Sequence, residues 1–141
     1  MADDAANPAE TGAPRSGERA TVFRLADLPT ARIGDTYRMA AIAGDHATVG
    51  MHWFEPGHPA WPAPHSHPYD QLAFVIEGSM RFTLGDETRI VHGPAVVHIP
   101  ADLPHSADVV GDKPCFNLDV FGLVREDFAH LFPHDRAEAD G

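Results

Sequence analysis

The chain has 141 residues and 43% of them are apolar, which suits one domain with a hydrophobic core. Its formal net charge of −11 argues against nucleic acid and against an anionic membrane surface as partners, because no basic stripe offsets the repulsion from phosphate groups. A small-molecule substrate, even an anionic one, is compatible with this charge if a metal ion and a local arginine set the potential inside a pocket.

Cysteine usage and the start of the chain favour the cytoplasm. The single cysteine, Cys115, cannot form an intrachain disulfide, which is typical of a reducing compartment. Residues 1–4 open no apolar segment, so no secretory signal is visible. No apolar run is longer than residues 72–76, which is far too short to span a membrane. We therefore expect a cytoplasmic protein without a membrane partner.

The chain is expected to form one domain between two tails. Residues 1–19 are rich in Ala, Asp, Glu, Gly and Pro and have no apolar period, which predicts a disordered N-terminal tail. Residues 20–132 carry all the regular patterning, and residues 133–141 are expected to form a C-terminal tail. No internal repeat interrupts the domain.

Short β-prone runs bounded by turn residues follow one another through the domain. We predict strands at residues 21–25, 37–43, 47–54, 71–77, 80–84, 88–92, 96–99, 105–110 and 115–121. Their spacing predicts an all-β antiparallel sandwich or barrel. Residues 123–132 are the one helical candidate, and Pro133 ends it.

The proline-rich stretch 55–64 is a predicted loop that leads to a histidine motif and forms the rim of a pocket. Trp61 in this loop either stacks on a ligand or covers the mouth of the barrel. His52, on the preceding strand, either looks into the pocket or lies on an ordinary sheet face.

Four side chains form a predicted metal site. In an extended strand, residues two apart point to the same face, so His65 and His67 can aim at one point. Gln71 keeps the same parity if the strand is not broken, and His105 can close the set from another strand. Three imidazoles and an amide oxygen suit one divalent transition metal, which can be Zn, Ni, Fe or Mn. Asp70 has the wrong parity to substitute for Gln71.

A second set of candidate residues follows in the last predicted strand. Asp119 and Phe121 share one strand face, and an acid there is a candidate proton donor or acceptor. Arg125, just after the strand, can hold a carboxylate bidentately. The alternative is structural: Asp119 and Arg125 pair with each other or cap the helix.

The spacing His65-x-His67-xxx-Gln71-xxxxxx-Gly78, followed by Gly93…Pro100-xxxx-His105, resembles the paired motifs of the cupin superfamily over about residues 50–122. The resemblance implies a single-domain antiparallel β-barrel of the cupin or jelly-roll type, with a short C-terminal helix. Single-domain cupins commonly pair through an early strand, which implies a homodimer formed through residues 21–25. In most cupins the fourth ligand is Glu, whereas this chain has Gln71.

A narrower resemblance concerns the substrate. The metal set followed by Asp-x-Phe-xxx-Arg-Glu-Asp is similar to the small cupins of pectin and alginate breakdown, which turn 4,5-unsaturated uronates into open-chain keto sugars. This likeness implies that Asp119, Phe121 and Arg125 face the substrate.

Three functions remain open at the level of sequence. The first is a metal-dependent lyase or isomerase acting on a small oxygenated, anionic, sugar-acid-like molecule. The second is an iron- or nickel-dependent cupin dioxygenase, which the neutral Gln71 disfavours because non-haem iron oxygenases use a carboxylate ligand. The third is a non-enzymatic cupin that binds a ligand or a metal.

Overall fold

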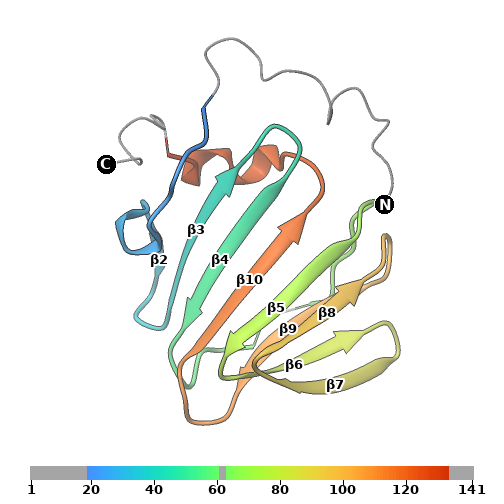
Figure 1. The fold of residues 1–141 in the computed structure, drawn as a ribbon. Helices are drawn as coiled ribbons and strands as arrows, with labels where there is room; N and C mark the ends of the chain where they lie inside the picture. The colour runs from blue at the N-terminus through green and yellow to red at the C-terminus, as the bar shows by residue number, and fades with distance from the viewer. Residues whose placement is uncertain (1–18, 61–62, 134–141) are drawn as a thin grey trace.

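The computed structural model describes residues 19–60 and 63–133, and nearly all of its regular structure is β (Figure 1). The strands are β2 (Ala31–Ile33), β3 (Tyr37–Ala43), β4 (Thr48–Phe54), β5 (Gln71–Glu77), β6 (Ser79–Leu84), β7 (Glu87–His92), β8 (Ala95–Ile99), β9 (His105–Val110) and β10 (Cys115–Phe121). Two short 3-10 helices, η1 (Leu25–Asp27) and η2 (Glu126–Leu131), complete the described elements.

The strands form two antiparallel sheets that face each other. The larger sheet has the order β2-β3-β4-β10-β5-β8, and the smaller has the order β7-β6-β9. Apolar side chains alternate along the strands and meet between the sheets, where Val75, Met80, Phe82 and Ile99 are buried. The predicted all-β antiparallel barrel is therefore confirmed.

A second apolar cluster lies on the outside of the larger sheet. Leu28, Ala40 and Met51 are buried there, and Phe23 packs against them from the segment before β2. Residues 21–25 therefore contribute an apolar anchor, but they do not form the predicted strand. That prediction was wrong. The strand through which two copies of the chain were expected to pair is therefore not formed by these residues.

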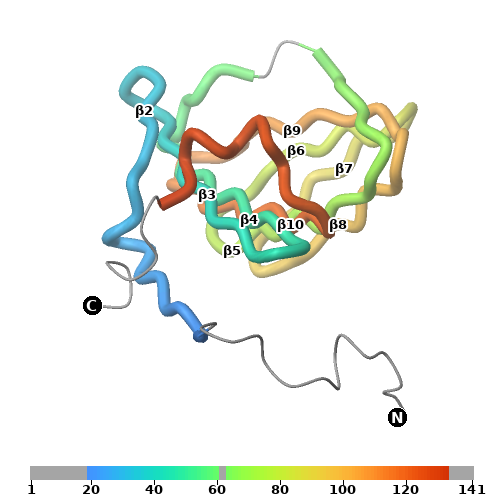
Figure 2. The backbone as a smooth tube through the Cα atoms, turned by 90° about the horizontal axis from the view of Figure 1, so that it is seen from above, coloured from blue at the N-terminus to red at the C-terminus, as the bar shows by residue number. Residues whose placement is uncertain are grey.

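The end of the described chain crosses one end of the barrel, where η2 contacts β3 (Figure 2). The predicted C-terminal helix is present, but it is shorter than expected and of the 3-10 type. Arg125, the residue before this helix, has an extended backbone, and its side chain does not cap the first turn. The predicted tails fall almost entirely outside the described residues, and so does Trp61.

Candidate metal centre

Backbone hydrogen bonds bring the predicted ligands together. The His65 N–H donates to the His105 carbonyl at 2.9 Å, and the His105 N–H donates to the His65 carbonyl at 2.8 Å. The His67 carbonyl accepts the N–H of Asp102 at 2.8 Å. His65 and His67 lie outside any strand, so these bonds, and not the parity of one continuous strand, determine their positions.

His65, His67 and His105 form what we call the three-His cluster. One ring nitrogen from each lies within 4.8 Å of the others. Within residues 19–60 and 63–133, this is the one group of His, Cys, Asp or Glu side chains with metal-ligand spacing. Imidazole nitrogens suit Zn, Ni, Cu and Fe, so the cluster suggests a metal-binding site.

The hydrogen bonds of two rings fix their tautomers. Nδ1 of His67 lies 2.8 Å from the Tyr69 carbonyl, and Nδ1 of His105 lies 2.8 Å from the Leu103 carbonyl. Because a carbonyl only accepts, each Nδ1 must carry the proton, and each neutral ring turns the lone pair of Nε2 into the cluster. Nε2 of His105 is buried and has no hydrogen-bond partner. An orphaned buried lone pair of this kind fits a metal ligand.

Burial also favours the neutral form that coordinates a metal. It lowers the pKa of His65 below the ordinary histidine value, and the imidazoles of His105 and His67 lower it further. Burial also lowers the pKa of His105, where it outweighs the opposing hydrogen bond to the Leu103 carbonyl, and the imidazole of His67 adds to the lowering. A histidine must be unprotonated to bind a metal, so the environment of these two rings suits that role.

Gln71 lies directly beside the cluster at the start of β5 and is only 8% exposed. Its Oε1 lies 3.2 Å from Nε2 of His67. Both atoms are acceptors when His67 is neutral with its proton on Nδ1, so no hydrogen bond joins them. Two ligands of one ion, each about 2.0–2.2 Å from it and roughly at right angles, would lie about 3 Å apart. The pair therefore has the spacing of neighbouring ligands.

Asp119 lies in the middle of β10 on the inner face of the sheet, with its side chain 14% exposed. Asn117 Nδ2 donates to its Oδ1 at 3.1 Å. Gln71 lies on the adjacent strand β5, two residues from the Ala73 that pairs with Asp119, and lines the same cavity. Nε2 of His52 lies 3.3 Å from Oδ2 of Asp119. Burial raises the pKa of Asp119, but the polar side chains of His52, Asn117 and Gln71, in that order, outweigh burial and leave the pKa below its ordinary value.

His52 lies between Asp119 and a buried tyrosine. Its Nδ1 lies 2.7 Å from the Tyr37 hydroxyl, and the two rings are stacked with centroids 5.8 Å apart. Burial, and then the charge of Asp119, raises the pKa of Tyr37 well above its ordinary value, so Tyr37 is a neutral phenol. No sequence signal singled out Tyr37, because its approach to His52 depends on the register of β3 against β4.

Arg125 lies at the rim of the same cavity and does not pair with Asp119. Its guanidinium forms a bidentate pair with Asp127, with distances of 2.5 and 3.1 Å. The guanidinium carbon lies 4.2 Å from the ring centroid of Phe128 and 4.7 Å from that of Phe121. The side chain is 18% exposed, so the aromatic rings hold a largely desolvated cation.

These side chains surround one cavity of about 440 Å³. The polar part of its wall includes His52, His65, Gln71, His105, Asn117, Asp119 and Arg125. The remainder is largely apolar and includes Met39, Phe54, Met80, Phe82, Ile99, Phe121 and Phe128. A small molecule held there would meet charged and polar groups on one side and an apolar wall on the other.

A family model for the cupin domain matches residues 51–121. The chain belongs to the cupin family. No curated protein matches it. Within the described ranges, no helix of this cupin is long and apolar enough to cross a membrane.

Solved structures share the fold at low sequence identity. KdgF from Halomonas sp. is 20% identical with a TM-score of 0.67, and the match covers 77% of this chain and 98% of KdgF. An RmlC-like cupin from Shewanella frigidimarina is 19% identical with a TM-score of 0.66, covering 79% of this chain and 96% of its own. A protein from Thermotoga maritima, described as a predicted oxalate decarboxylase, is 17% identical with a TM-score of 0.63. The match covers 73% of this chain and 99% of that protein. At these identities the likeness shows the fold alone.

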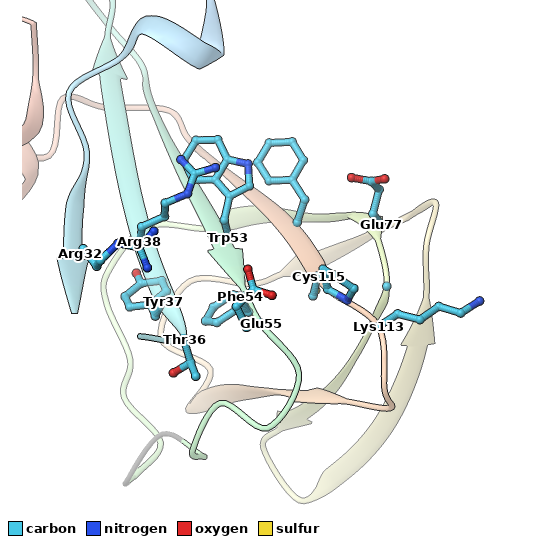
Figure 3. A pocket seen from close by; sticks show the side chains of 13 residues that line it. Arg32, Thr36, Tyr37, Arg38, Trp53, Phe54, Glu55, Glu77, Lys113 and Cys115 are labelled. Atoms are coloured by element: carbon cyan, nitrogen blue, oxygen red, sulfur yellow. The ribbon is translucent and has the colours of Figure 1, made fainter. Parts of the chain in front are cut away.

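The cupin barrel also has a second hollow, of about 330 Å³, at the end where β3 and β10 begin (Figure 3). Tyr37 and Phe54 line both this hollow and the main cavity. Arg38 lies over the ring of Trp53 at 4.1 Å, with Lys113 farther along the wall. None of the predicted site residues that the structure describes lines this hollow. The main cavity is lined by seven of them: His52, His65, Gln71, His105, Asp119, Phe121 and Arg125.

Proposed function

We propose that this cupin binds one divalent transition metal through His65, His67, Gln71 and His105, and acts as a lyase or isomerase on a small anionic, sugar-acid-like molecule. The observation that carries the metal site is the convergence of lone pairs: Nε2 of His67, the orphaned Nε2 of His105 and Oε1 of Gln71. A divalent ion there would act as a Lewis acid that polarises a substrate carbonyl or hydroxyl oxygen.

The proposed reaction depends on a proton-transfer group beside that site. Asp119 lines the same cavity as Gln71 and lies on the neighbouring strand, which supports a role for its carboxylate close to the proposed metal. The N–H groups of neighbouring side chains stabilise the carboxylate form of Asp119. We therefore propose that Asp119 takes a proton from the bound substrate and returns it at carbon or at an enol-ether oxygen.

The proposed anion-binding group is Arg125. Its guanidinium already holds the carboxylate of Asp127 bidentately, and a substrate carboxylate would use the same geometry. Phe121 and Phe128 provide flat apolar surfaces beside it. The sequence resemblance to uronate-linearising cupins supports an unsaturated uronate as the first substrate to test.

Elemental analysis tests the metal site. Wild-type protein should carry about one equivalent of metal, and His67→Ala should lose most of it. His98→Ala is the matched control, because His98 is exposed and pairs with Asp70 on the outside of the barrel. Full metal occupancy in His67→Ala would contradict the proposed ligand set.

Activity assays separate the three candidate functions. A lyase or isomerase should remove the ultraviolet absorbance of an unsaturated uronate without consuming oxygen. A dioxygenase should take up oxygen with an enolic or phenolic substrate after anaerobic loading with iron. A metal-loaded protein that turns over neither the unsaturated uronate nor the enolic and phenolic substrates would be a binding protein. The homodimer also remains a proposal, which light scattering at micromolar concentration tests directly.

A further inference from the structure

A glutamine ligand such as Gln71 must be held in one orientation to bind a metal, whereas a glutamate ligand need not be. Either oxygen of a carboxylate can bind a metal, whereas an amide has one acceptor oxygen and one NH₂ group, which only donates. Gln71 must therefore be held with Oε1 toward the three-His cluster and its NH₂ turned away. A half-turn of the amide would aim two N–H groups at the metal position.

We propose that Asp119 fixes the orientation of the Gln71 amide, and that His52, itself held by Tyr37, fixes Asp119. This inference rests on the proposed metal site and adds a positioning role for three residues that do not coordinate the metal themselves.

The chemistry of the contacts supplies the direction. Asp119 lies opposite Ala73, two residues along β5 from Gln71, and both side chains line the same cavity. A carboxylate only accepts hydrogen bonds, so the end of the amide that suits the side of Asp119 is the NH₂ group. With the NH₂ group turned toward Asp119, Oε1 is the end that lies 3.2 Å from His67 Nε2. The flipped amide would turn its oxygen toward the carboxylate, and two acceptors would face each other.

Asn117 and His52 also hold the carboxylate of Asp119 in place. Asn117 donates to Oδ1 of Asp119 at 3.1 Å and to the carbonyl of Phe74 at 2.9 Å, which ties the carboxylate to the neighbouring strand. His52 approaches Oδ2 with Nε2 at 3.3 Å, a contact longer or more bent than a well-formed hydrogen bond.

Tyr37 selects the tautomer of His52. The one proton of its hydroxyl has two acceptors within reach, Sδ of Met39 at 3.3 Å and Nδ1 of His52 at 2.7 Å. The thioether is the weaker acceptor, and donation to Nδ1 leaves the ring proton of His52 on Nε2, the nitrogen that faces Asp119. The donor groups then all face toward Asp119: the Tyr37 hydroxyl faces His52, and Nε2–H of His52 and the NH₂ group of Gln71 face the carboxylate.

Gly50 makes room for this arrangement. It lies opposite Asp119 in the pairing of β4 with β10. A Cβ at this position would lie 3.2 Å from Nε2 of His52 and 3.1 Å from the ring of Phe128. A side chain there would press on His52 at the point where it meets Asp119.

Cobalt binding tests the proposal without any substrate. Co²⁺ reports its ligands in its visible spectrum, and competition with Zn²⁺ gives affinities. Asp119→Asn should weaken Co²⁺ binding about 10–100-fold, the usual effect of removing an outer-sphere partner, and should change the spectrum. Circular dichroism and the melting temperature of the metal-free variant check that the fold is kept.

A double-mutant cycle separates orientation from simple loss of charge. In a Gln71→Glu background the ligand needs no orientation, and its carboxylate would meet that of Asp119. Asp119→Asn should then relieve the repulsion and weaken Co²⁺ binding by less than about 3-fold, or strengthen it. An equal loss of affinity in both backgrounds would overturn the proposal, because it would show that Asp119 acts through charge alone.

His52 variants test the outer part of this series of polar contacts. His52→Phe should change the Co²⁺ spectrum and lower affinity, whereas His52→Gln keeps an N–H donor and should recover part of both. A His52→Phe protein with wild-type spectrum and affinity would remove His52 and Tyr37 from the inference. If wild-type protein binds neither Co²⁺ nor Zn²⁺, the proposed metal centre itself is wrong.

Discussion

Thr48 provides a sharp test of how the rim of the cavity is held. Its side chain is fully buried at the start of β4. The hydroxyl donates to the carbonyl of Leu123 at 2.7 Å and accepts the N–H of Arg125 at 2.8 Å. One side chain thus fixes the turn between β10 and η2 at two backbone groups, and it determines where Arg125 leaves the sheet.

Thr48→Val keeps the shape and removes both hydrogen bonds. Each backbone group left without a partner costs about 1–3 kcal/mol, with the lower end expected here because Leu123 and Arg125 are only half-buried. The free energy of unfolding should therefore fall by about 2–4 kcal/mol, and for a domain of this size the melting temperature should fall by roughly 3–5 °C per kcal/mol.

Urea and thermal denaturation of the metal-free protein measure this directly. Thr48→Ser is the matched control, because it keeps the hydroxyl and loses only a methyl group, and it should cost about 1 kcal/mol. If Thr48→Val is as stable as Thr48→Ser, the two hydrogen bonds do not hold the rim and the reasoning fails.

Three further predictions concern the cavity. Asp119→Asn, assayed at saturating metal, should lower turnover by about 10²–10⁴-fold, the usual contribution of a positioned proton-transfer group. If the variant keeps wild-type turnover, Asp119 does not transfer a proton and its role is structural. Arg125→Lys should raise KM more than it lowers kcat, because lysine keeps the charge but loses the bidentate fork, and steady-state kinetics on an anionic substrate measures this. Acid should weaken the metal-free fold: the unfolded chain takes up protons at His65 and His105 near the ordinary pKa of about 6.5, whereas the folded chain does so only at lower pH. The free energy of unfolding should therefore fall as pH drops below about 6.5, with a weaker dependence in His105→Gln, measured by urea denaturation at pH 7.5 and 5.5.

Much of the fold could be predicted from sequence because its signals are local. Alternating apolar residues and turn residues placed the strands from β3 to β10 within about a residue of their observed ends. The short strand β2 was missed, because three residues, Ala31–Ile33, carry too little pattern. Residues 21–25 have β-prone composition, yet they contribute Phe23 to an apolar cluster without joining a sheet.

The candidate site was only partly predictable because it depends on contacts between distant strands. Its residue types and spacings indicated a metal set, but His65 and His67 reach it through a bridge to β9 and not along one strand. The partner of Arg125 was not foreseen: Asp127 is two residues away, and the side chain turns toward it and not toward Asp119. The contact of Tyr37 with His52 needed the register of β3 on β4, which no local pattern specifies.

Position 71 is constrained from two sides, and this gives a physical reason for the departure from the glutamate that most cupins use. One side of Gln71 faces the lone pair of His67, where an acceptor is needed if a metal binds. The other side faces the neighbouring strand that carries the carboxylate of Asp119, where a donor is needed. A glutamate would satisfy the first requirement and violate the second, because two buried carboxylates in contact disfavour each other's charged form. Only an amide offers an acceptor to one side and a donor to the other. If Asp119 transfers a proton and a metal binds as proposed, both requirements favour glutamine at position 71, and a neutral ligand would leave the metal more of its positive charge for polarising a substrate.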